Sequence, residues 1–102
     1  MNHVIYTVFD SASGVYDRPF VANSDGSAVR AFGDICMSAD HPIGQHPEDY
    51  SLYRIGTFDD NNAVIKPEDR ICLITGQEAV SRAGKVNGDQ LSLLDREVSG
   101  SA

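Results

Sequence analysis

The sequence lacks several features that would assign it to a functional class. It contains no tryptophan, only two cysteines and no cluster of lysine or arginine residues. Disulfide-stapled secreted domains are much richer in cysteine, and tight binding of duplex DNA needs clustered cationic contacts to phosphate. The longest apolar run, residues 71–74, is far shorter than the ~20 residues that cross a bilayer. We therefore expect neither a small secreted scaffold nor a membrane partner.

The start of the chain, the two cysteines and the net charge indicate the compartment and limit the ligands. No basic stretch followed by a long apolar one opens the chain, so we expect no secretory signal. Cys36 and Cys72 are expected to be reduced thiols packed as small apolar side chains. The net charge of −7 disfavours binding to the phosphate groups of nucleic acid. It leaves open the binding of single strands through aromatic stacking and a few arginines.

The chain length of 102 residues is that of one domain. Residues 4–9 are β-branched or aromatic throughout and predict a strand. A turn at 10–14 leads to a second strand over 15–22, which Pro19 confines to a sheet edge or a bulge. Further strands are predicted at 50–58, 63–66 and 70–75, with a loop fixed by two prolines at 41–49.

One helix is predicted between these strands. Apolar residues recur at helical spacing over 26–38, and the residues expected to pack on the sheet are Ala28, Val29, Phe32, Ile35 and Cys36. The fold class is therefore α+β, a mostly antiparallel sheet of four to five strands with one helix packed on one face. We place this domain at residues 1–76. Residues 77–102 are predicted to be a polar, mobile tail, in which Leu91, Leu94 and Val98 indicate at most a short helix.

No catalytic constellation is visible, and we expect a protein without enzymatic activity, cofactor or metal. Three histidines, His3, His41 and His46, could bind zinc together with a carboxylate, but spacing within a loop is weak support, and we interpret them as exposed loop histidines. The acidic pairs at 59–60 and 68–69 lie in predicted turns, where Asp is used for backbone hydrogen bonding.

Aromatic residues on the predicted strands offer a binding surface. Rings and arginines on an open sheet face stack unpaired bases in several small folds. The residues that we assign to such a nucleic-acid site are Tyr6, Tyr16, Arg18 and Arg54. Part of the rings must instead form the core, and Phe20 and Phe58 are the expected core residues.

Three segments carry a resemblance to a known family. Residues 5–11 lead to Arg18-Pro19-Phe20, residues 28–32 follow on the helix, and residues 46–59 enter a strand that ends in Gly-x-Phe-Asp. In order and spacing, residues 4–75 resemble the small non-structural protein of gokushoviruses, which are single-stranded DNA phages among the microviruses. That family is usually equated with the microvirus C protein.

The resemblance implies a non-structural phage protein in the cytoplasm of a host bacterium. It implies a role in genome replication or in the switch to single-strand synthesis and packaging, with single-stranded DNA, the replication initiator or the capsid precursor as partners. The family supplies no catalytic residues to carry over. The alternative is a purely protein-binding factor acting on capsid precursor or host machinery, and a sheet edge could also pair two copies of the chain.

Overall fold

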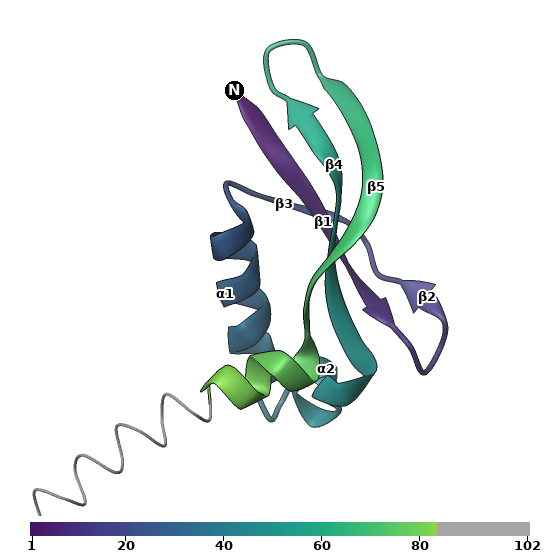
Figure 1. Ribbon diagram of the computed structural model, residues 1–102, viewed down its shortest axis with the longest axis vertical. Helices are drawn as coiled ribbons and strands as arrows, with labels where there is room; N and C mark the ends of the chain where they lie inside the picture. The colour runs from purple at the N-terminus through teal and green to yellow at the C-terminus, as the bar shows by residue number, and fades with distance from the viewer. Residues whose placement is uncertain (84–102) are drawn as a thin grey trace, which may run out of the picture.

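A curled antiparallel sheet is the centre of the computed structural model, which describes residues 1–83 (Figure 1). The strands are β1 (Asn2–Asp10), β2 (Val15–Tyr16), β3 (Phe20–Ala22), β4 (Tyr50–Asp59) and β5 (Val64–Thr75). Their order is β2-β1-β4-β5, and β3 pairs with β1 farther along the same edge as β2. The predicted α+β class and antiparallel sheet are confirmed.

Helix α1 (Asp25–Cys36) matches the helix expected over 26–38. Ser24 caps it, because its side-chain oxygen accepts a hydrogen bond from the backbone N–H of Ser27 at 3.1 Å. Ala28, Phe32 and Cys36 are buried against the sheet, and Val29 and Ile35 are half-buried beside them. The predicted apolar face of the helix is therefore correct.

The core joins α1 to the three long strands. Its largest fully buried side chains are Tyr6 from β1, Leu52 from β4, Ile74 from β5 and Phe32 from α1. Phe20 packs against this core from β3, as expected. Phe58 does not, because it lies on the opposite face of the sheet together with Ile5 and Ile65.

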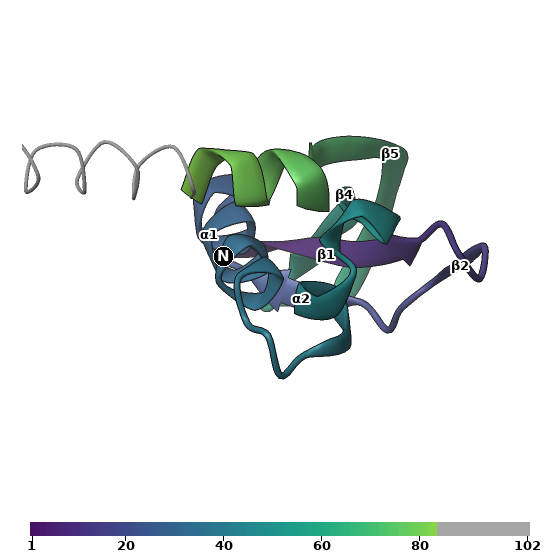
Figure 2. The same ribbon diagram turned by 90° about the horizontal axis from the view of Figure 1, so that it is seen from below.

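The folded part of the chain continues beyond Gly76, the domain boundary expected from the sequence. Residues 76–83 are helical, and Ala79 is only 5% exposed within the core. Figures 1 and 2 show this segment lying against α1. Polar residues outnumber apolar ones here, so composition alone concealed a helix whose core contacts come from Ala79 and the partly buried Val80. The predicted helix around Leu91, Leu94 and Val98 lies outside the described residues.

Two further segments differ from expectation. The predicted loop at 41–49 contains two short helical turns, α2 (Pro42–Gln45) and η1 (Pro47–Asp49), and Ile43 of α2 is part of the buried core. The strands predicted at 63–66 and 70–75 form one strand, β5. Pro67 is tolerated there because β5 is an edge strand, and residues 68–70 bulge out of the ladder with β4.

Gly56 permits the close approach of β4 and β5 beside this bulge. It is buried, and a Cβ atom at this position would collide with the backbone carbonyl of Lys66.

Within residues 1–83, no helix is long and apolar enough to cross a membrane.

Replacing Phe32 with alanine tests the packing of α1. Phe32 is 2% exposed, so the variant is expected to lose about 3–5 kcal/mol of unfolding free energy. Urea denaturation followed by circular dichroism measures this loss. Met37→Ala is the control, because Met37 is 47% exposed at the end of the same helix and should change stability by less than about 0.5 kcal/mol. Equal effects of the two substitutions would refute the assigned face.

Candidate functional site

The two faces of the sheet have different roles. Side chains alternate along β1, so Tyr6 and Val8 point into the core, whereas Ile5, Thr7 and Phe9 lie on the other side. We call the side away from α1 the outer face.

A polar network on the inner face joins three elements. The hydroxyl of Tyr6 donates to Oδ1 of Asp25 at 2.8 Å, and Nη1 of Arg54 donates to Oδ2 of the same carboxylate at 2.7 Å. Asp25 opens α1, where a negative charge interacts favourably with the helix dipole. Tyr6 and Arg54 are cross-strand partners on β1 and β4, so a single carboxylate holds the helix to both central strands.

Glu68 extends this network to β5. Its Oε1 lies 3.8 Å from Nε of Arg54, close enough for charge attraction but too long for a hydrogen bond. Nε of Arg54 is buried and has no hydrogen-bond partner among the described residues. The single positive charge of Arg54 is thus flanked by two carboxylates.

This network contains Tyr6 and Arg54, two of the four residues predicted for the nucleic-acid site. Tyr6 is fully buried, so its ring cannot stack on a base. Burial raises the pKa of the Tyr6 hydroxyl, and the hydrogen bond to Asp25 raises it further. Arg54 would have to leave Asp25 and Glu68 to reach a phosphate. Tyr6 is therefore structural, and Arg54 is held between two carboxylates. The alternating pattern could not show this network, because the carboxylate that binds both residues comes from another element.

The other two predicted residues, Tyr16 and Arg18, are exposed on the β2 side of the sheet. Tyr16 belongs to an aromatic cluster on the outer face. Its ring centroid lies 4.6 Å from that of Phe9 and 5.7 Å from that of Tyr53. Cζ of Arg70 lies 5.9 Å from the centroid of Tyr16, which is cation–π distance. Arg70 was missed because the bulge in β5 decides where its side chain goes.

The contact between Tyr16 and Arg70 also shows how the sheet curls. β2 and β5 are separated in the sheet by β1 and β4, and adjacent strands lie about 4.8 Å apart. Curling of the sheet, together with two long side chains, brings Tyr16 and Arg70 together across the outer face. That face is therefore concave.

A groove runs along this concave face, and we call it the outer groove. Its apolar section has a volume of about 270 Å³ and is lined by Ile5, Pro19, Val21, Phe58 and Ile65. Its polar section has a volume of about 550 Å³ and is lined by Thr7, Tyr16, Asp17, Pro19, Ile55, Glu68, Asp69 and Arg70. The two sections share Pro19, so they adjoin. β1 and β4 supply the floor, and residues 16–21 and 65–70 supply the sides.

Carboxylates dominate the charge around the polar section. Asp17, Glu68 and Asp69 line it beside the single cation Arg70, and no salt bridge within residues 1–83 involves Asp17 or Asp69. This end of the outer face carries a negative potential.

The three histidines do not come together. His3 pairs with Asp60 through Nε2 at 2.9 Å, Nδ1 of His41 accepts from the backbone N–H of Ile43, and His46 lies beside Glu48. Each therefore has a local structural partner.

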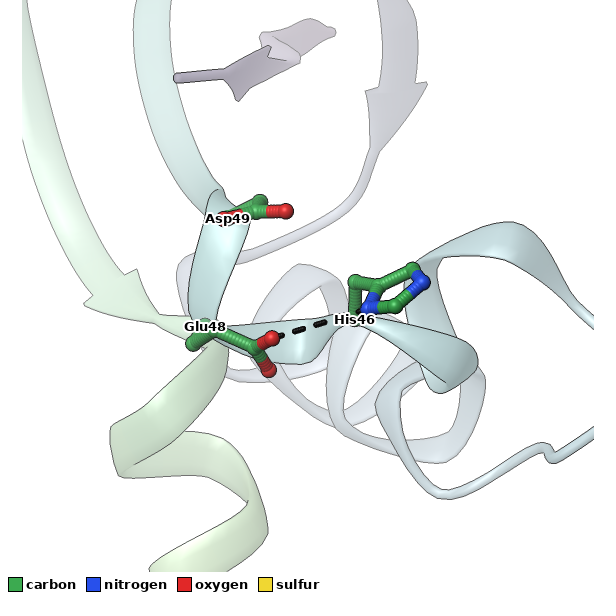
Figure 3. A group of neighbouring side chains, drawn as sticks. All are labelled: His46, Glu48 and Asp49. Atoms are coloured by element: carbon green, nitrogen blue, oxygen red, sulfur yellow. Dashed lines mark ion pairs between the residues drawn. The ribbon is translucent and has the colours of Figure 1, made fainter. Parts of the chain in front are cut away.

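His46, Glu48 and Asp49 do form a small surface cluster (Figure 3). One potential ligand atom from each lies within 4.8 Å of the others, but His46 and Glu48 are exposed. The turn is already held by its backbone, since the carbonyl of Asp49 accepts hydrogen bonds from N and Oγ of Ser11. The cluster is explained without an ion, and we assign no metal site to it.

The cysteines differ from each other. Cys36 is buried in the core, as expected, and burial raises the pKa of its thiol to about 11. Cys72 on β5 is exposed, and its cross-strand partner is Tyr53 on β4. The expectation that Cys72 is packed was therefore wrong.

Tyr6→Phe tests the structural role of the inner network. The substitution keeps the ring but removes the hydrogen bond to Asp25, and a hydrogen bond to a charged partner is worth about 1.5–3 kcal/mol. Urea unfolding should show a loss of this size. Tyr16→Phe removes an exposed hydroxyl on the outer face and should have almost no effect. Similar results for both variants would argue against the network.

Comparison with known proteins identifies the family but adds no further relative. A family model described as phage ORF5 protein matches residues 3–80, which include the inner network and the outer groove. No curated protein and no solved structure matches the chain. The match covers most of the chain, and the protein therefore belongs to the phage ORF5 protein family.

Proposed function

We propose that this phage protein acts without catalysis, in genome replication or in the switch to single-strand synthesis and packaging, by binding a protein of the replication complex. The observation that carries the proposal is the outer groove, an open concave surface that is apolar at one end and acidic at the other. Grooves that combine apolar lining with a few polar groups are typical of binding sites.

Three polar side chains of the groove are held by contacts within the domain, which favours binding over chemistry. Thr7 has a hydroxyl on the floor, but this hydroxyl donates to the backbone carbonyl of Asp17 at 2.7 Å. Glu68 faces Arg54 in the inner network, and Arg70 lies over the ring of Tyr16. Each of these groups already has a structural partner within the domain.

Two further considerations support the proposed role and the proposed class of partner. The resemblance to the gokushovirus non-structural protein, and through it to the microvirus C protein, supports a role in replication in the host cytoplasm. The net charge of −7 favours a protein partner over a nucleic acid, with the replication initiator or the capsid precursor as candidates.

Site-specific photocrosslinking in infected cells tests this proposal. A photoreactive phenylalanine analogue replaces Val21, which is 53% exposed in the groove. The same analogue at Ala31, exposed on α1, is the matched control. We expect adducts with a phage replication or capsid-precursor protein from position 21 only, and we expect them to survive nuclease treatment. Identical adducts at both positions, or none at position 21, would contradict the proposal.

Single-stranded DNA is the second candidate ligand, and the contact between Arg70 and Tyr16 favours it. Base stacking on an exposed ring contributes about 1–3 kcal/mol per base. Fluorescence anisotropy with labelled oligo-dT and duplex DNA at low salt measures the binding of the chain to each form of DNA. This candidate requires single-strand binding that is lost in Tyr16→Ala/Arg70→Ala and retained in Arg30→Ala. Absence of binding to either DNA would eliminate it.

A further inference from the structure

The outer groove has a chemical polarity that specifies its ligand more closely. Its apolar section exposes aliphatic side chains, with Val21 at 53% and Ile65 at 63% exposure. Isolated exposed aliphatic residues are ordinary on a protein surface. Here, however, they face each other across Ile5 and Phe58 and form one continuous apolar lining.

The neighbouring section selects for positive charge. Asp17 and Asp69 are the two carboxylates there that have no ion-pair partner within residues 1–83. The positive charge of Arg70 lies over the ring of Tyr16. A cationic side chain entering this section would meet uncompensated negative charge, and such complementarity steers association and gives specificity.

The direction of the groove favours an extended ligand. Ile5 and Thr7 are successive outer-face residues of β1, and they lie in the apolar and polar sections respectively. The groove thus follows β1, and an extended peptide lying along it would pass from one section to the other.

Pairing of a second copy along the free edge of β5 fits less well. That edge carries Lys66, Pro67 and the bulge at 68–70, and a proline, a lysine or a bulge on an edge strand opposes pairing with another chain.

We propose that the outer groove binds an extended peptide segment of a partner protein in which aliphatic residues adjoin an arginine or lysine. This inference rests on the proposed function and adds the chemistry of the partner segment. The aliphatic residues occupy the section lined by Val21 and Ile65, and the cation lies between Asp17 and Asp69.

Selection from a random peptide display library on the immobilised full chain tests this chemistry. We expect enriched sequences to carry adjacent aliphatic and basic residues. For a synthetic peptide of the enriched sequence, Ile65→Ser should weaken binding about tenfold, and Asp69→Asn should weaken it and reduce its salt dependence. The matched controls are Val15→Ser and Asp34→Asn, which are exposed outside the groove and should bind normally.

The outcomes separate this inference from the proposed function. Enrichment of acidic peptides, no enrichment, or binding indifferent to Ile65→Ser and Asp69→Asn would overturn the inference. If position 21 still crosslinks to a phage protein in that case, the proposed function stands and only the ligand chemistry is wrong. Competition of the peptide by oligo-dT but not by salt alone would overturn the inference in favour of DNA. A peptide that only dimerises the chain in sedimentation, without occupying the groove, would also overturn it.

Discussion

The arrangement of this domain depends on the two hydrogen bonds that the carboxylate of Asp25 accepts. This residue accepts hydrogen bonds from Tyr6 on β1 and Arg54 on β4 while it opens α1. A buried tyrosine hydroxyl and a half-buried guanidinium both need partners, and one side chain supplies both. The first turn of the helix is thereby fixed against the two central strands, and Phe32 then packs farther along the same face.

The structural contacts of the helices lie on the inner face of the sheet, so the outer face is available for function. The inner face is occupied by α1 and residues 76–83, whereas the curl of the sheet makes the outer face concave. The sides of the groove come from the irregular segments at 16–21 and 65–70. The two central strands, β1 and β4, therefore provide the floor, and the prolines and bulge of the flanking segments shape the binding surface.

The sequence predicted the elements with strong local signals. The spacing of apolar residues located α1 and its buried face, and the run of β-branched and aromatic residues located β1. It did not predict which face of the sheet each ring occupies, because Tyr6 and Phe58 exchange their expected roles only through contacts distant in sequence. The helix at 76–83 was missed for a similar reason, since Ala79 is small and its burial depends on α1 and Ile74.

A double-mutant cycle between Asp25 and Arg54 tests the central claim most directly. Asp25→Asn, Arg54→Met and the combined variant are compared with the native chain by urea unfolding. Because both side chains are partly exposed, the account predicts a coupling energy of about 1 kcal/mol. Effects of the two substitutions that add to within about 0.3 kcal/mol would show that this carboxylate does not hold α1 to the sheet.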